Sequence, residues 1–202
     1  MMTIGFIIDG KEMASASGKT FDRMDPVTTK VATTAPAANL ADVDAVAKSA
    51  AKAFANWSET GPNERRSLLN KAADLMESRA DEFIRLMLEE TGATAPWSGF
   101  NVRLGASVLR EAAALTTQIT GEIIPSDKPG IVSMAVRQPV GVVLGMAPWN
   151  APIILGARAI AAALACGNTV ILRSSESCPG VHHLIVKTLN DAGFPAGVVN
   201  VI

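Results

Sequence analysis

The chain has 202 residues, a mass of 21.0 kDa and a formal net charge of −1, a size that suits one domain or two small ones. Its 18 basic and 19 acidic residues nearly balance, so charge gives no reason to bind nucleic acid or an anionic membrane. A hydrophobic fraction of 49% excludes a disordered chain. Alanine is abundant, whereas aromatic residues make up only 4%, which favours close packing of helices on a sheet over a β-sandwich.

The cysteine content and the N-terminal residues favour a cytoplasmic location. Cys166 and Cys178 are too few for a disulfide framework, and low cysteine usage fits a reducing compartment. No basic segment precedes the short apolar start of the chain, which is interrupted by Asp9, Lys11 and Glu12. We therefore expect no signal peptide.

One uncharged stretch, between Arg137 and Arg158, is long enough to suggest a membrane span. Pro148 and Pro152 would break a helix in the middle of this stretch. The stretch is therefore predicted to form a strand, a turn and the start of a helix. No membrane partner is expected.

Short strands and one helix are predicted near the N-terminus. Two turn signals within residues 4–36, Asp9-Gly10 and Ser17-Gly18, indicate short strands joined by hairpins. Residues 39–57 are predicted to form a helix capped by Asn39. Its apolar residues at helical spacing are Val43, Val46, Ala47, Ala50 and Phe54.

Three further helices are expected in the first half of the chain. Pro62 opens one of them, and a second covers about 81–90 and ends at Thr91-Gly92, where glycine suits a left-handed cap. The third covers 96–117, where Trp97 shares a face with Phe100 or Asn101 and with Leu104. The apolar face of the helix that Pro62 opens consists of Leu68, Leu69, Ala72, Leu75 and Met76.

The second half alternates strands with helices. Residues 131–137 favour a strand, and the continuous apolar run 141–148 predicts a strand buried on both faces of a parallel sheet. The β-α-β-α-β order that follows predicts parallel pairing with right-handed crossovers. The fold class is therefore α/β, with half of a doubly wound parallel sheet. The remaining elements are helices over about 152–165 and 179–191 and strands over 168–172 and 198–202.

The predicted sheet is incomplete. Its third strand ends at Ile202 without a covering helix, and the helices of the first half have no sheet of their own. We therefore expect the sequence to be a fragment of a longer protein rather than a complete small α/β protein.

The candidate site lies at the carboxyl ends of the strands, where open α/β sheets bind their ligands. Two such ends carry suggestive residues, namely Gly145–Asn150 after one strand and Leu172–Glu176 after the next. Neither end contains the dinucleotide fingerprint GxGxxG or the P-loop pattern GxxxxGK[ST].

Three segments in that half, GVVLGMAPWNAP, ALACGNTVILRSSE and DAGFPAGVVNVI, resemble the NAD(P)-dependent aldehyde dehydrogenase superfamily. The N-terminal strands and the helices containing ADVDAVAKSAAKAF and PNERRSLL also match, so the resemblance covers essentially the whole chain in the family's order. Within the superfamily, the chain most resembles the branch that oxidises aromatic aldehydes such as salicylaldehyde. The resemblance implies a cytoplasmic oxidoreductase that converts an aldehyde to a carboxylic acid with NAD.

The resemblance also implies a domain organisation. Residues 1–120 would be the N-terminal helices and β-ribbon of the cofactor-binding domain, and 139–202 the first β-α-β-α-β of its Rossmann-like part. Residues 121–138 would be strands that include an oligomerisation hairpin. Family members form dimers or tetramers partly through this region, so a homo-oligomer is expected for the full-length enzyme.

Asn150 is the candidate catalytic residue. In the family, the amide of this asparagine points at the aldehyde oxygen and stabilises the alkoxide that forms when a cysteine thiolate attacks. Loss of one such donor typically costs about 2.7–4 kcal/mol. The alternative is that Asn150 caps the helix that starts at Ala151-Pro152.

A second family motif, a Lys-Pro-Ser-Glu run, holds the adenosine ribose of the cofactor. Here the run is Arg173-Ser174-Ser175-Glu176, and the Glu176 carboxylate favours NAD because it would repel the 2′-phosphate of NADP. Arg173 replaces the lysine and could bind that phosphate, so NADP stays possible. The alternative is a solvated charged turn. The residues expected to border the nicotinamide are Met146, Ala147, Pro148 and Trp149.

The substrate is expected to pack against two helices. Ala151, Leu155 and Arg158 share one helix face, which lines the substrate tunnel in the family. A cation at Arg158 suits a ring with a polar substituent next to the aldehyde. The ring-packing wall would come from Trp97, Phe100 and Leu104. The alternative is that Arg158 pairs with a carboxylate at an interface and that Trp97 is a core residue.

The family's nucleophilic cysteine, its general-base glutamate and its second glycine-rich turn are expected downstream of residue 202. Cys178 precedes Pro179 at a helix start, where the helix dipole would lower a thiol pKa, but no base or family motif surrounds it. Cys166 fits a small buried residue at a helix end. Cys178 and His182 are too few to hold a metal, so no metal is expected.

Two other classes of protein compete with this interpretation. One is a non-catalytic nucleotide-binding module, and the other is an acylating relative that uses coenzyme A. A reading frame that continues past Ile202 into a glycine-rich turn and a cysteine would exclude the binding module. The residues around the missing cysteine and glutamate would separate the dehydrogenase from the acylating relative, because only hydrolysis needs a glutamate that activates water.

Overall fold

The computed structural model describes residues 1–202 and contains six helices and ten strands. The helices are α1 (Leu40–Trp57), α2 (Pro62–Ser78), α3 (Ala80–Thr91), α4 (Ala95–Leu115), α5 (Pro152–Ala165) and α6 (Pro179–Asp191). The first five strands are β1 (Met2–Thr3), β2 (Phe6–Ile8), β3 (Lys11–Met13), β4 (Thr20–Met24) and β5 (Val31–Pro36). The others are β6 (Glu122–Ile124), β7 (Ser133–Ala135), β8 (Val142–Met146), β9 (Thr169–Arg173) and β10 (Val199–Val201). All the predicted helices are present, and the bounds of α5 and α6 agree with the prediction.

The central sheet has five strands in the order β3-β2-β10-β9-β8. Strands β8, β9 and β10 are parallel, as the β-α-β-α-β pattern predicts. Strand β2 pairs with β10 in the antiparallel sense, which extends the sheet with a piece of the N-terminus. The expectation that the first half of the chain has no sheet of its own was wrong, because β1, β5 and β4 form a three-stranded sheet in that order.

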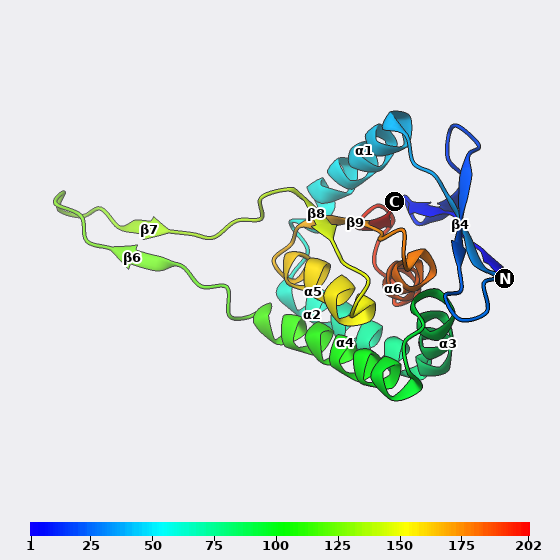
Figure 1. Cartoon of the computed structure of the whole chain (residues 1–202). Coiled ribbons are helices and arrows are strands. Elements are labelled where there is room, and N and C mark those ends of the chain that lie inside the picture. Colours follow the sequence, from blue (N-terminus) through cyan, green and yellow to red (C-terminus); the bar gives the residue numbers. More distant parts are fainter.

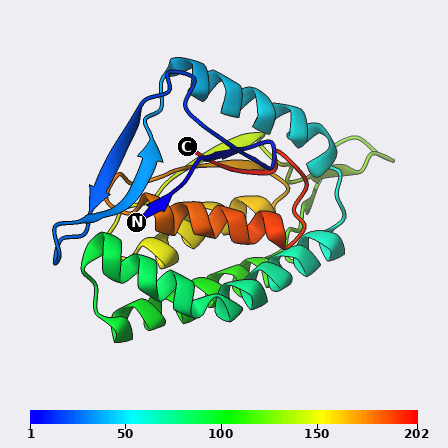
Figure 2. The same ribbon diagram turned by 90° about the vertical axis from the view of Figure 1, so that its right-hand side faces the viewer.

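Helices cover both faces of the central sheet (Figure 2). Helix α1 lies on one face, where it contacts β8 and β9, and α5 and α6 lie on the other. Helices α2, α3 and α4 form a further layer behind α5 and α6. The main hydrophobic core lies between these layers and includes Trp57 and Phe194, whose rings are 5.5 Å apart.

The two turn signals in the N-terminal strands have different outcomes. Asp9 and Gly10 both have positive φ, at 54° and 72°, and join β2 to β3 as the predicted hairpin. Gly18 also has positive φ, but its turn joins β3 to β4, which lie in different sheets. The prediction of a hairpin at Ser17-Gly18 was wrong, because β4 pairs with β5 instead.

Helix α1 begins as predicted, but its buried stripe is different. Asn39 accepts hydrogen bonds from the backbone of Ala41 and Asp42, and the Asp42 carboxylate accepts one from the backbone of Asn39. Val43 and Ala47, expected on the apolar face, are exposed. The buried positions are Asp42, Val46, Ala50 and Trp57, so the face is rotated towards the Asp42 side. Burial of the Asp42 carboxylate is tolerated because it accepts a hydrogen bond of 2.8 Å from the Ser15 hydroxyl.

Strand β8 is not buried on both faces as expected. Its residues alternate in exposure, and Val142, Leu144 and Met146 face solvent. Strand β8 lies at the edge of the sheet, and α1 packs mainly on its neighbour β9. On the covered face, a Cβ built on Gly145 would lie 3.1 Å from Ala159 of α5, so glycine permits this close packing.

Strands β6 and β7 form a separate antiparallel ribbon that projects from the rest of the molecule (Figure 1). The strand predicted over 131–137 is shorter and is confined to β7. Large apolar side chains along the ribbon, including Ile123 and Met134, are exposed. No helix in the structure has the length and hydropathy needed to cross a bilayer.

Candidate functional site

Both predicted site segments lie at one edge of the central sheet. Strands β8 and β9 pair in register, with Gly145 opposite Leu172 and Met146 opposite Arg173. The two strands therefore end side by side. The turn that carries Asn150 and the turn that carries Glu176 leave the sheet at its carboxyl edge, which is the ligand-binding edge of this fold class.

Asn150 is exposed, and its side-chain amide makes no hydrogen bond within the chain. Its backbone carbonyl accepts a hydrogen bond of 3.4 Å from the Trp97 indole on α4. The N-cap of α5 is Ala151, and no side chain caps this helix. The alternative in which the Asn150 side chain caps the helix is therefore wrong, and the amide is available to a ligand.

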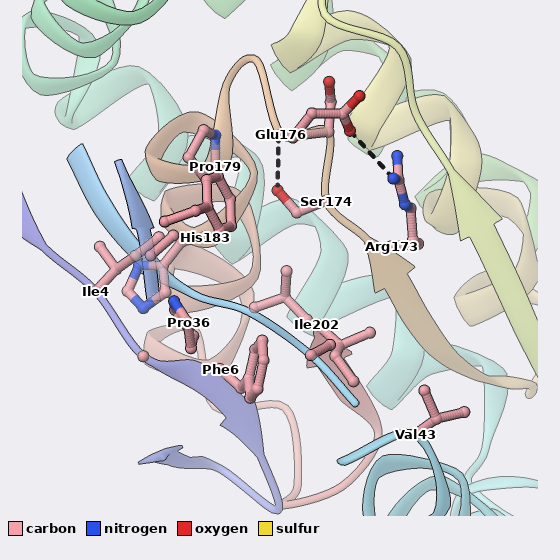
Figure 3. Close-up of a pocket in the computed structure, with 16 residues that line it drawn as sticks. Ile4, Phe6, Pro36, Val43, Arg173, Ser174, Glu176, Pro179, His183 and Ile202 are labelled. Carbon is pink, nitrogen blue, oxygen red and sulfur yellow. Dashed lines mark hydrogen bonds and ion pairs between the residues drawn. The ribbon is translucent and has the colours of Figure 1, made fainter. Parts of the chain in front are cut away.

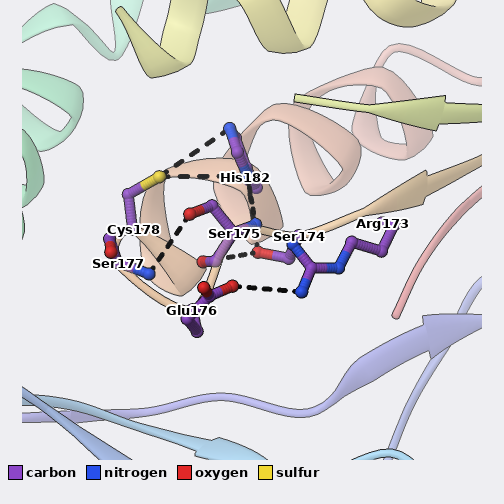
Figure 4. Close-up of polar contacts among 7 residues, drawn as sticks. All are labelled: Arg173, Ser174, Ser175, Glu176, Ser177, Cys178 and His182. Carbon is purple, nitrogen blue, oxygen red and sulfur yellow. Dashed lines mark hydrogen bonds and ion pairs between the residues drawn. The ribbon is translucent and has the colours of Figure 1, made fainter. Parts of the chain in front are cut away.

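The turn after β9 is held by an ion pair. Arg173 Nη2 lies 3.1 Å from Glu176 Oε2, and both side chains are exposed (Figure 4). The pKa of Glu176 is lowered, first by its own backbone N–H and then by the charge of Arg173. At neutral pH, Glu176 is therefore a carboxylate that can accept hydrogen bonds from hydroxyl groups.

Ser175 has a structural position within the same turn. It is buried, its hydroxyl accepts a hydrogen bond of 3.2 Å from the backbone of Ser177, and its own backbone N–H donates to His182. This inward orientation fixes the turn rather than presenting the Ser175 hydroxyl to solvent.

A cavity of about 240 Å³ lies beside this turn (Figure 3). Arg173 and Glu176 lie on its polar side, and its apolar side chains come from the N-terminal strands, the start of α1, the start of α6 and the end of the chain after β9. The apolar side includes Ile4, Phe6, Pro36, Val43 and Ile202. The sequence analysis missed this apolar side, because no local pattern indicates that the N-terminal hairpin lies next to β10. Residues Met146–Asn150 do not line this cavity.

The expected substrate wall lies partly beside Asn150. Trp97 and Phe100 stack with their rings 5.5 Å apart, and both are 42% exposed, so Trp97 is not a core residue. Their helix, α4, packs along α5, which carries Leu155 and Arg158. Arg158 is exposed and forms no ion pair with a carboxylate of the chain. Leu104 and Leu155 are half-buried and Ala151 is buried.

Cys178 does not have the properties of a nucleophile. Burial raises the pKa of the Cys178 thiol, and the negative charge of Glu90 raises it further. The expectation that a helix start lowers this pKa was wrong, because burial outweighs the dipole. Cys166 is half-buried at the end of α5. Cys178 Sγ lies 3.8 Å from His182 Nε2, and no third potential metal ligand joins them.

The two adjacent histidines point apart, as helical spacing predicts. His182 faces the turn after β9, where its Nδ1 lies 3.0 Å from the Ser175 nitrogen. His183 faces the opposite way, with its Nε2 3.4 Å from Glu12. The contact between His182 and Ser175 escaped the sequence analysis, since a histidine in an apolar helix gives no sign of its partner.

Residues 13–202 match the aldehyde dehydrogenase family. This match covers more than half of the chain, and the chain therefore belongs to that family.

Three relatives illustrate its place there. A vanillin dehydrogenase of Pseudomonas fluorescens is 54% identical over the whole chain, which covers 42% of that protein. The crystal structure of a salicylaldehyde dehydrogenase from Pseudomonas putida G7, complexed with salicylaldehyde, has a TM-score of 0.97 and 47% identity, with 100% of this chain and 42% of that one covered. The structure of PnpE in complex with nicotinamide adenine dinucleotide has a TM-score of 0.95 and 36% identity, with 98% of this chain and 41% of that one covered. The chain thus spans about two fifths of the length of the relatives it matches.

Proposed function

We propose that residues 1–202 are part of an NAD-dependent dehydrogenase that oxidises an aromatic aldehyde to the carboxylic acid. The observation that supports this most is the register of β8 and β9, which brings the Asn150 turn and the Arg173–Glu176 turn to one edge of the sheet. In a member of the aldehyde dehydrogenase family, this edge offers a hydrogen-bond donor for the aldehyde next to acceptors for a nucleotide.

Asn150 stabilises the developing alkoxide in this proposal. Its amide has no partner within the chain, and it sits on a turn held from both sides by β8 and α5. A donor that is already in place does not have to reorganise when negative charge forms on the aldehyde oxygen. The Trp97 hydrogen bond to the Asn150 carbonyl helps to fix the turn from α4.

The turn after β9 fits the ribose of a nicotinamide cofactor. When bound, this cofactor accepts the hydride of the reaction. Glu176 is ionised and exposed, so its two oxygens can accept hydrogen bonds from neighbouring hydroxyls. Arg173 forms an ion pair with Glu176 and lessens the repulsion that the carboxylate alone would exert on a 2′-phosphate. NAD is the preferred cofactor in this proposal, and NADP is a poorer second. Met146, Ala147, Pro148 and Trp149 would border the nicotinamide.

The substrate wall consists of Trp97 and Leu104 on α4 with Ala151, Leu155 and Arg158 at the start of α5. The stacked, exposed rings of Trp97 and Phe100 offer an aromatic face near Asn150. Arg158, without an acidic partner, can interact with a polar ring substituent such as an ortho hydroxyl. Salicylaldehyde, present in the complex of the Pseudomonas putida relative, has this substituent and is our first candidate.

The nucleophilic cysteine and the general-base glutamate lie outside residues 1–202 in this proposal, since Cys178 is buried with a raised pKa and Cys166 lies at the far end of α5. Residues 1–202 alone are then inactive. The whole enzyme is a cytoplasmic homo-oligomer, and the exposed apolar side chains of the β6–β7 ribbon are the proposed subunit contact.

Formation of NADH tests this function. We expect the whole enzyme to reduce NAD with salicylaldehyde or vanillin and to release the free acid without coenzyme A, whereas purified residues 1–202 reduce none. Turnover by residues 1–202 would show that a nucleophile lies within them. A product formed only with coenzyme A, as a thioester, would favour the acylating alternative, and NAD binding without turnover by the whole protein would favour the binding module.

A further inference from the structure

His182 lies beneath the turn that follows β9. It is completely buried on the first turns of α6, and its Nδ1 lies 3.0 Å from the backbone nitrogen of Ser175 (Figure 4). The Ser174 hydroxyl also lies 3.4 Å from His182 Nδ1. The ring thus contacts the segment between Arg173 and Glu176 from beneath, while those two side chains point outward.

The chemistry of this contact fixes the protonation of the ring. A backbone N–H can only donate, so Nδ1 of His182 accepts and carries no proton. The remaining proton of the neutral ring is then on Nε2. Burial lowers the pKa of His182 to about 4, so the ring is neutral at pH 7 and keeps one acceptor and one donor.

The other side of the ring faces α5. On this side, His182 Nε2 lies 3.8 Å from Cys178 Sγ, at the N-cap of α6. A Cβ built on Gly156 would lie 3.4 Å from His182 Cδ2 and 2.6 Å from Ile185, so glycine allows α6 to approach α5 this closely.

We propose that His182 is a positioning residue that holds the cofactor-ribose turn in place through its contact with the backbone of Ser175. The inference rests on the proposed function. His182 touches neither cofactor nor substrate in this role. Only Nδ1 contacts the turn, so substitutions that keep or remove an acceptor at its level separate positioning of the turn from general packing.

Three substitutions in the whole enzyme test this role. In His182→Asn, the side-chain oxygen lies at the level of Nδ1, so the Ser175 contact is kept. In His182→Gln, the side-chain amide lies at the level of Nε2, so the Ser175 contact is lost. His182→Leu loses it as well. Thr188→Val is the matched control, because Thr188 is also buried on α6 and bonds a side chain, Arg79, away from the site.

The measurements are the Kd of NAD by calorimetry without aldehyde, and kcat with KM in the full reaction. We expect His182→Gln and His182→Leu to raise the Kd and KM of NAD by roughly tenfold, the effect of leaving one buried N–H unpaired in the binding turn. His182→Asn should keep the wild-type Kd. Thr188→Val should change stability only.

Wild-type NAD affinity in a folded His182→Leu variant, or in His182→Gln if the leucine variant does not fold, would overturn the inference while leaving the proposed function intact. Equal loss of NAD affinity in the asparagine and glutamine variants would also overturn it, because a general packing defect does not distinguish the two nitrogens. If the wild-type enzyme does not bind NAD, the proposed function and the inference fail together.

Discussion

At the scale of single residues, the site combines exposed polar groups with a buried support. Asn150 and Glu176 are exposed, whereas Ser175 and His182 are buried beneath the turn. Buried polar groups that hydrogen-bond one another rigidify a segment, because a broken contact would leave an unsatisfied group in the interior. This support lets an exposed turn hold a defined geometry.

The charge on Glu176 makes a prediction about cofactor choice. Glu176→Gln should raise the kcat/KM ratio of NADP to NAD by roughly tenfold, since the repulsion of a 2′-phosphate is removed and Arg173 loses its partner. Steady-state kinetics of the whole enzyme with both cofactors measure the ratio. Glu111→Gln, at an exposed site on α4, is the control. An unchanged ratio would exclude Glu176 from the cofactor site.

The buried imidazole of His182 makes a prediction about pH. Because its folded pKa, about 4, is below the ordinary value of 6.5, its contribution to stability is present above pH 6.5 and is lost as the pH falls through 4. Arg173 lowers the pKa further by charge, whereas the backbone of Pro152 raises it. The stability difference between wild type and His182→Asn should therefore be smaller at pH 5 than at pH 7, by about 2 kcal/mol.

Urea unfolding of residues 1–202 and of the variant at both pH values measures this difference. His183, whose pKa is also lowered, is present in both proteins, so its effect on the pH dependence of stability cancels in the difference. A difference that does not change with pH would mean that His182 titrates normally in the folded chain.

At the scale of elements, the helices are positioned by their ends. The reciprocal capping of Asn39 and Asp42 starts α1, with hydrogen bonds of 2.7 Å and 2.9 Å from Ala41 to Asn39 and from Asn39 to Asp42. Gly92 ends α3 in the left-handed conformation, with φ of 68°. Glu90, buried on the last turn of α3, accepts hydrogen bonds from the backbone of Gly180 and Val181 and so joins α3 to the start of α6.

The cap of α1 makes a prediction about stability. Asn39→Ala should lower the free energy of unfolding of residues 1–202 by about 1 kcal/mol, because two backbone N–H groups lose their acceptor. Asn56→Ala, at an exposed position near the other end of the same helix, should change it little. Chemical unfolding measures both, and equal effects of the two substitutions would contradict the role of the cap.

At the scale of the whole molecule, the sequence predicts local structure well and long-range pairing poorly. The bounds of α5 and α6 and the parallel order of β8, β9 and β10 follow from apolar runs bounded by proline and glycine. The pairing of β2 with β10 joins residues from opposite ends of the chain, as Ile7 lies opposite Val201, and no local pattern encodes that contact.

The candidate site also has parts that the sequence predicts and parts that it does not. The strand ends that carry Asn150 and Glu176 could be located from the sequence, because parallel strands in this order finish at one edge. The ion pair of Arg173 with Glu176 and the support of the turn by His182 depend on side-chain directions that spacing does not determine. The exposure of alternate residues on β8 likewise depends on its place at the sheet edge.

The most direct test of the account is the kcat of Asn150→Ala in the whole enzyme with NAD and salicylaldehyde. Loss of the one amide donor at the carboxyl edge should lower kcat by about 10²–10³-fold, while the Kd of NAD stays at the wild-type value. A kcat within a few-fold of wild type would contradict the account, because the alkoxide would then be stabilised by some other group.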